Sequence, residues 1–196
     1  MQMGYWYKTS DITPDMGVVP EVPGRETLHA LTFGDGQFYF RTMAFTLQNA
    51  GDTFGRFTAL RYYDFNKLYH WFSLLDELDS KSNMIPSMAT YYFAQTQNTP
   101  DVRYIVDYLY EHATKDVAHK WWWLMQSIYL SMHKLNDSDL ALKVAKPLQD
   151  PSVPVWAREM TAVVHEKRGE MDDALHIMEA IKQNAENIPD ADLNYM

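Results

Sequence analysis

The chain has 196 residues, of which 46% are hydrophobic and 14% aromatic, so it is long and apolar enough to form a globular domain with a sizeable core. Its formal net charge of −9 and its lack of a basic stripe argue against binding to a nucleic-acid backbone. It contains no cysteine, which excludes disulfides, thiolate metal sites and cysteine nucleophiles.

Residues 1–24 are expected to form an extended arm. Residues 9–24, TSDITPDMGVVPEVPG, hold three prolines and two glycines, and residues before proline avoid the helical region. The preceding MQMGYWYKTS has no signal-peptide core but places a Tyr-Trp-Tyr run ahead of Lys8. These aromatics either pack onto the protein's own surface, are left from cloning, or follow a transmembrane helix upstream of residue 1. No run of about 18 apolar residues occurs in the chain itself.

After the arm, the spacing of apolar residues predicts helices nearly to the end of the chain. The breaks QNAGDT, DSKSNMIPS, QNTPDV, KLNDSDL, QDPSVPVW and KRGEMDDAL contain the polar residues, glycines and prolines that end helices. Capping roles are expected for Gly51 at a left-handed helix end and, as N-caps, for Asn83, Thr99 and either Asp137 or Ser138. Eight helices are predicted, at residues 36–50, 64–79, 84–97, 101–113, 118–134, 138–148, 154–168 and 171–184.

Two of the predicted helix–turn–helix units are related by a spacing of 33 residues. KLNDSDLALKVAKPL aligns with KRGEMDDALHIMEAI. The aligned pairs include Asn136 with Gly169, Asp137 with Glu170, Ala141 with Ala174, Leu142 with Leu175 and Leu148 with Ile181. A fixed period of about 33–34 residues with a helix–turn–helix unit is typical of helical repeat arrays.

In these features the chain resembles the tetratricopeptide-repeat family. The match is best over residues 155–186, where the family's small, turn, small and large positions are filled by Ala162, Gly169, Ala174 and Met178. The resemblance implies an all-α fold for residues 25–196, a right-handed superhelix of about four antiparallel helix pairs. It also suggests the soluble part of a bacterial membrane-anchored envelope protein, with a cytoplasmic protein as the alternative.

The predicted helix 118–134 carries three consecutive tryptophans in HKWWWLMQ. Successive residues on a helix are about 100° apart, so the three indoles cover roughly 200° of its surface. A repeat array explains this, because the leading helix of each pair contacts its own partner and both neighbouring pairs. We therefore expect Trp122, Leu124 and Met125 to pack between pairs, and Trp123 to line the groove of the array.

The sequence contains no clear catalytic or metal-binding pattern. No two histidines have the spacing of a zinc hydrolase, HEKRGE offers no second histidine, and GxSxG is absent. We therefore expect no catalytic residue, no cofactor and no metal ion. His70 is expected to be a hydrogen-bonded core or interface residue, and FGDGQF at 33–38 the start of the first helix. Asp76, Glu77 and Asp79 lack the spacing of a calcium loop and are expected to form a solvated helix end.

The family's inward-facing positions on the leading helices predict a groove that binds a partner. In this chain they are Arg41, Phe45, Gln48, Met88, Tyr92, Gln95, Trp123, Gln126, Leu130, Trp156, Glu159 and Val163. Aromatic and arginine side chains are frequent at binding hot spots. The asparagines and lysines with which some family members hold a peptide's carboxylate are absent. The groove is either open to a partner or filled by a neighbouring helix, by the arm or by a second copy.

The sequence therefore predicts a protein–protein interaction scaffold, and not an enzyme, that binds a partner protein or peptide and supports assembly of a larger complex. Nucleic acid is not an expected partner, membrane association would need a segment upstream of residue 1, and a homo-oligomer is an open alternative. Two other functions stay open: an obligate structural subunit of a membrane-associated assembly, and a helical domain that binds a small ligand.

Overall fold

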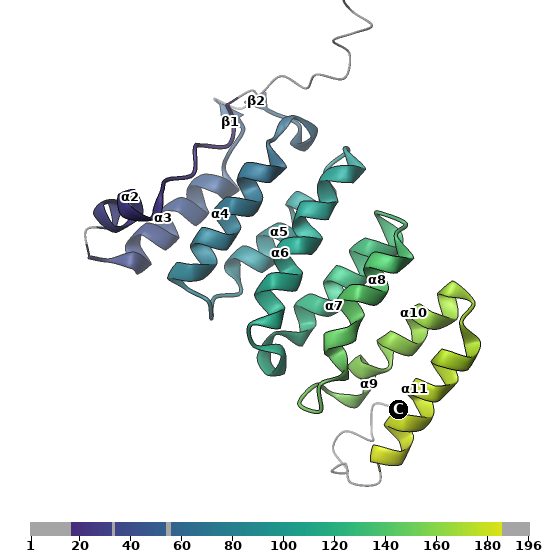
Figure 1. The fold of residues 1–196 in the computed structure, drawn as a ribbon. Coiled ribbons are helices and arrows are strands. Elements are labelled where there is room, and N and C mark those ends of the chain that lie inside the picture. The colour runs from purple at the N-terminus through teal and green to yellow at the C-terminus, as the bar shows by residue number, and fades with distance from the viewer. Residues whose placement is uncertain (1–16, 33, 54–55, 186–196) are drawn as a thin grey trace, which may run out of the picture. The chain divides into compact units, whose positions relative to one another are not determined.

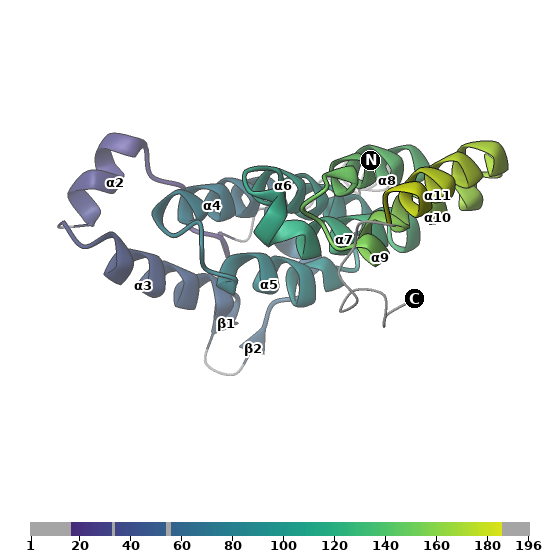
Figure 2. The ribbon, with the colours of Figure 1, turned by 90° about the horizontal axis from the view of Figure 1, so that it is seen from below.

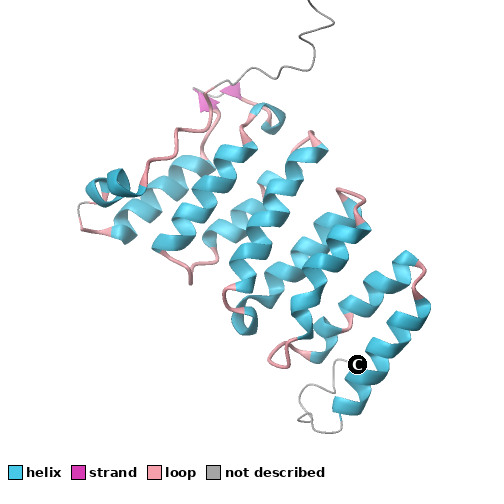
Figure 3. Ribbon diagram, viewed as in Figure 1, coloured by secondary structure: helices cyan, strands magenta, loops and turns pink. Residues whose placement is uncertain are grey.

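The computed structural model describes residues 17–32, 34–53 and 56–185. Figure 3 shows that this part of the chain is helical apart from one short antiparallel strand pair, β1 (Asp52–Thr53) with β2 (Arg56–Phe57). The prediction of an all-α protein is confirmed at this level. No helix among these residues is long and apolar enough to cross a membrane.

The chain divides into two compact units, each built around its own helices. The first is drawn from Met1–Ile85 and Gln95–Asn98, and the second from Pro86–Ala94 and Thr99–Met196. We describe them separately.

The first unit is built on two packed helices, α3 (Gly36–Gln48) and α4 (Phe65–Leu78). Each begins at an aspartate whose carboxylate accepts a backbone N–H three residues on: Asp35 from Phe38 and Asp64 from Lys67, both at 2.9 Å. The core between them contains Phe40, Ala44 and Leu47 of α3, and Phe65, Leu68, Trp71, Phe72 and Leu75 of α4.

A short helix that the sequence analysis missed, α2 (Arg25–Leu31), precedes α3. FGDGQF does start a helix, as expected, but that helix is not the first one. The α2 segment buries Leu28 while Thr27, Ala30 and Leu31 are exposed. It therefore lacks the apolar periodicity from which a helix is predicted.

Gly51 has the left-handed conformation expected of it, with a φ of +79°, but it lies one residue beyond the predicted C′ position because Asn49 is the C-cap of α3. The chain then forms the β1–β2 hairpin and a 3₁₀ turn, η1 (Leu60–Tyr62). The hydroxyl of buried Tyr63 donates to the carbonyl of Ala50, so the phenol ring lies directly against this turn.

The segment before α2 packs onto α4. Val19 is buried, the indole Nε1 of Trp71 donates to the carbonyl of Pro20 at 2.8 Å, and Lys67 pairs with Glu21 at 2.7 Å. Residues 17–24 form neither helix nor strand and contain bends at Gly17 and Val19. The aromatic run before Lys8 lies outside the described residues.

The second unit packs its helices in chain order: α6 contacts α7, α7 contacts α8, α8 contacts α10, and α10 contacts α11 (Figure 1). Figure 2 shows α6, α8 and α11 along one side of this unit, and α5, α7 and α9 along the other. The elements are α5 (Met84–Tyr91, beginning in the first unit), η2 (Phe93–Gln95), η3 (Thr99–Asp101), α6 (Val102–Thr114), α7 (Val117–His133), α8 (Ser138–Ala145), η4 (Lys146–Gln149), α9 (Val155–Arg158), α10 (Met160–Arg168) and α11 (Met171–Ala185).

The turns before α8 and α11 share the geometry that the 33-residue spacing implies. Asn136 and Gly169 both have a positive φ, 52° and 79°. Their neighbours begin the next helices, and Asp137 is the N-cap of α8, accepting from the backbone N–H of Leu140 at 2.8 Å. The aligned apolar residues are buried at the same places: Ala141 with Ala174, and Leu148 with Ile181.

Three of the predicted helices are shorter or more broken than expected, and a fourth starts one residue late. The one predicted at 84–97 ends as an α-helix at Tyr91 and continues as η2. Thr99 opens the 3₁₀ turn η3 and is not an N-cap, because α6 starts only at Val102. The one predicted at 138–148 becomes α8 and η4, with Pro147 in the 3₁₀ segment, and the one at 154–168 divides into α9 and α10.

Candidate functional site

The second unit carries a continuous row of aromatic side chains, Tyr91, Trp122, Trp121 and Trp156, which we call the aromatic stripe. The indole Nε1 of Trp122 donates to the hydroxyl of Tyr91 at 3.3 Å. The ring of Trp121 meets that of Trp122 edge to face, with centroids 6.0 Å apart, and that of Trp156 at 5.1 Å. The stripe therefore joins side chains of α5, α7 and α9, which lie on the same side of the unit (Figure 2).

The tryptophan triplet of α7 places one indole inside and two toward the surface. Trp123 is 5% exposed and Leu124 is fully buried, whereas Trp122 is 42% exposed and Trp121 is half-buried. The inner face of α7 also contains Ser127, whose hydroxyl donates to the carbonyl of Trp123 at 2.9 Å and so needs no partner outside the helix.

This arrangement contradicts the predicted roles of Trp122 and Trp123. The prediction placed Trp123 in the groove and Trp122 in the packing, and the structure has the opposite. The inner face of α7 contains two buried serines, Ser127 and Ser131, besides Ile128. Serines on a buried face weaken the apolar periodicity from which the phase of a helix is deduced, which explains the error.

The other predicted groove residues do not form one surface. Trp156 belongs to the aromatic stripe, and neighbouring Tyr92 is exposed, its ring edge-on to buried Phe93 at 4.9 Å. Three are buried and cannot line a groove: Met88, Trp123 and Leu130. The remainder are half-buried (Gln126, Glu159) or exposed (Val163, and in the first unit Arg41, Phe45, Gln48 and Gln95). The predicted groove did not include Tyr91 and Trp121, although each is adjacent in sequence to a predicted groove residue or its neighbour, in the runs YY and WWW.

The chemistry of the stripe is that of recognition. It offers indole and phenol faces and edges, and its one ionisable side chain is the phenol of Tyr91. Close to it in sequence, the N-terminus of α7 carries an ion pair between Asp116 and His119, with Nδ1 to Oδ1 at 2.9 Å. The hydrogen bond from His119 lowers the pKa of Asp116. The stripe itself contains no nucleophile or general acid–base pair.

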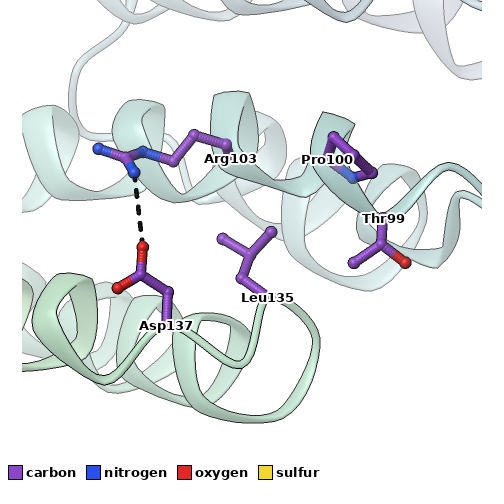
Figure 4. A pocket seen from close by; sticks show the side chains of 5 residues that line it. All are labelled: Thr99, Pro100, Arg103, Leu135 and Asp137. Carbon is purple, nitrogen blue, oxygen red and sulfur yellow. Dashed lines mark ion pairs between the residues drawn. The ribbon is translucent and has the colours of Figure 1, made fainter.

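A hollow of about 390 Å³ lies beside the start of α6, lined by Thr99, Pro100, Arg103, Leu135 and Asp137 (Figure 4). The guanidinium of Arg103 lies 3.8 Å from the carboxylate of Asp137 and 3.1 Å from that of Asp107, so its charge is already balanced. Most of the lining is exposed, and none of the predicted groove residues belongs to it. Its lining does not form a recognisable catalytic or ligand-binding arrangement.

A second polar cluster surrounds the turn between α10 and α11. The nearest ligand atoms of His165, Glu170 and Asp173 lie within 4.8 Å of one another, a spacing that could hold a cation. However, Nε of Arg168 donates to both oxygens of Glu170 at 2.9 Å, while its Nη1 pairs with Asp139 of α8. A cation would have to displace this guanidinium, so we interpret the cluster as an ion-pair network that links α8, α10 and α11.

The protonation behaviour of this network follows from the same contacts. Hydrogen bonds from Arg168 and then His165 lower the pKa of Glu170. Hydrogen bonds to Asp139 and Glu170 raise the pKa of Arg168. Both shifts favour the charged forms, as expected for an ion pair.

Two other side chains differ from the expectations. His70 is exposed: its Nδ1 donates to the carbonyl of Asn66 at 2.8 Å, so it is hydrogen-bonded but not part of the core. Asp76 is 2% exposed, so the acidic end of α4 is not wholly solvated, although Glu77 is exposed. The residue faces the interior because it shares the face of α4 that carries Phe72.

Comparisons with protein-family models, curated proteins and solved structures give no match. The function is therefore argued from the geometry of this chain. Among the surfaces of the described ranges, the aromatic stripe combines large apolar area with hydrogen-bonding groups, and it is our candidate site.

Proposed function

We propose that this protein is a tetratricopeptide-like scaffold that binds a partner peptide or protein through the aromatic stripe. The observation that carries the proposal is the continuity of Tyr91, Trp122, Trp121 and Trp156 over three helices. A row of this kind can contact an extended peptide segment at several points, whereas an isolated surface aromatic can contact it at only one.

The helix packing supports the scaffold part of the proposal. Helices that contact their neighbours in chain order, with equivalent turns at Asn136 and Gly169, are what a helix–turn–helix repeat requires. A right-handed superhelix of about four pairs is the arrangement proposed. In the tetratricopeptide family the leading helices line the binding surface, and α5, α7 and α9, which supply the stripe, correspond to leading helices in the predicted pairs.

The energetics favour recognition over chemistry as the work of this surface. The rings of Trp121, Trp122 and Trp156 hold one another edge to face, so little side-chain entropy remains to be lost on binding. Tryptophan and tyrosine are enriched among the residues whose truncation costs about 2 kcal/mol or more of binding free energy. We propose on this basis a binding protein and not an enzyme.

A peptide-display selection tests the proposal without a known partner. Peptides selected on the parent protein are measured by calorimetry against the parent, Trp122→Ala and a matched control, Phe57→Ala, which removes a side chain 81% exposed on β2, outside the stripe. We expect Trp122→Ala to weaken binding about 30-fold, the equivalent of about 2 kcal/mol. The control should bind like the parent.

The melting temperature of each variant provides the check on folding. If peptides that bind the parent also bind Trp122→Ala and a Trp156→Ala variant equally well, while both variants melt cooperatively, the stripe is not the binding surface.

A further inference from the structure

Helix α11 leaves an apolar face exposed. Met171, Leu175 and Met178 are 55%, 60% and 43% exposed, and their spacing of four and three residues places them along one side of the helix. We call these three residues the α11 stripe. The adjoining face of α11, with Ala174 and Ile181, is buried.

At the C-terminal end of α8, the position equivalent to Met178 is covered by the next leading helix, while the positions equivalent to Leu175 and Met171 are half-buried and exposed. The 33-residue alignment places Met178 on Ala145, which is fully buried where the hydroxyl of Thr161 of α10 donates to its carbonyl at 3.2 Å. An ion pair completes this contact, from Arg168 of α10 to Asp139 of α8. Met178 of the α11 stripe therefore has the position of a residue that packs against a leading helix, and Leu175 and Met171 extend this apolar surface toward the start of α11.

Helix α11 also carries an acidic residue equivalent to the one on α8 that pairs with Arg168 of α10. Asp139 aligns with Asp172, which is exposed at the start of α11. Within the described part of the chain, Asp172 has no ion-pair partner. A helix that docks on α11 as α10 docks on α8 would therefore bring a basic side chain beside Asp172.

Helix α3, a leading helix of the first unit, offers a matching face. Phe38 and Phe45 are 69% and 65% exposed and lie two turns apart on one side of α3, with exposed Arg41 between them. We call these three residues the α3 stripe. Among the residues described, Arg41 also lacks an ion-pair partner. The stripe thus combines apolar side chains with the charge that Asp172 requires.

We propose that copies of this protein associate head to tail, the α3 stripe of one copy packing on the α11 stripe of the next. Phe38 and Phe45 then cover Leu175 and its methionine neighbours, and Arg41 pairs with Asp172 of the next copy. The two faces are different, so the contact is heterologous and extends into a ring or a filament. Two stripes of three residues make a small interface, which is typical of weak, concentration-dependent association.

Two single-face variants give the sharpest test. Phe45→Asp blocks the α3 stripe and Leu175→Asp blocks the α11 stripe, so each variant alone should remain at the mass of one chain. An equimolar mixture keeps one intact face of each kind and should form a dimer and nothing larger. The parent, followed by light scattering over a concentration series, should exceed the mass of a dimer. Phe57→Asp, which changes a side chain 81% exposed outside both stripes, should associate like the parent.

Circular dichroism of each variant checks that it is folded, and a charge-reversal pair provides an independent route if an aspartate in a stripe unfolds the chain. Arg41→Asp and Asp172→Arg should each weaken self-association, and the two together in one chain should restore it. The proposal is overturned if the parent has the mass of one chain throughout the series, if either blocked variant self-associates like the parent, or if the mixture stays monomeric.

Discussion

Replacing Gly51 with alanine tests the turn that joins α3 to the β1–β2 hairpin. A Cβ at this position would lie 2.1 Å from the hydroxyl oxygen of Tyr63, 2.9 Å from its Cζ and 3.2 Å from Cβ of Thr58. Tyr63 is buried and its hydroxyl is held by the carbonyl of Ala50, so the phenol ring has to move as a whole. The φ of +79° adds strain that any L side chain would feel.

Three costs add up in this variant. The left-handed backbone costs about 1 kcal/mol for alanine, loss of the tyrosine hydrogen bond about 1 kcal/mol, and displacement of a packed ring about 1 kcal/mol or more. A loss of about 3 kcal/mol lowers the melting temperature of a chain of this size by about 6–12 °C. Differential scanning calorimetry measures this shift directly.

Gly169→Ala is the matched control. Gly169 has the same φ of +79°, but nothing lies within 4 Å of the Cβ that alanine would add. This variant therefore shows the backbone strain alone, about 1 kcal/mol or roughly 2–4 °C. Equal shifts for the two variants would refute the steric argument, and adding Tyr63→Phe to Gly51→Ala should recover part of the loss if it is correct.

Three further outcomes are expected. Asp137→Ala removes the N-cap of α8 and should cost about 1 kcal/mol in chemical denaturation, whereas an unchanged midpoint would contradict the capping role. The pKa of Glu170 is lowered below its ordinary value of 4.5, so its contribution to stability is complete above that pH and is lost as the pH falls through the lowered value. The difference in melting temperature between the parent and Glu170→Gln should therefore shrink from about pH 7 to about pH 3, and a difference independent of pH would show that the pair with Arg168 adds nothing. Trp71→Phe deletes the indole donor to Pro20 and should make residues 17–24 more sensitive to proteolysis, and an unchanged cleavage pattern would show that this hydrogen bond does not hold the segment.

The helices of the second unit could be predicted because their signals are local. Asp137 next to a positive-φ Asn136, and Gly169 before the last helix, mark turns whose chemistry is decided by a few neighbouring residues. Apolar periodicity then locates each helical segment, although it does not predict the 3₁₀ segments η2 and η4 or the division between α9 and α10. Helix α2 escaped prediction since a seven-residue segment with one buried leucine has no period to detect.

The surface was harder to predict than the helices, because exposure depends on which face of a helix its neighbours cover. A rotation error of one residue moves a side chain by about 100°, and this is the error made at Trp122 and Trp123. Buried serines on α7 and a buried Asp76 on α4 contradict the rule that polar residues face water. The hydroxyls of Ser127 and Ser131 donate to backbone carbonyls four residues earlier in α7, which satisfies them without water.

Packing in chain order has a consequence for local unfolding. Helix α11 contacts α9 and α10, whereas α7 contacts α6, α8 and η4. Local unfolding of α11 therefore disrupts the packing against fewer neighbouring elements than unfolding of α7. Amide hydrogens of α11 should therefore exchange with solvent sooner than those of α7, without global unfolding. A copy docked on α11 would slow that exchange, so the exchange rate of α11 reports whether its apolar face is covered.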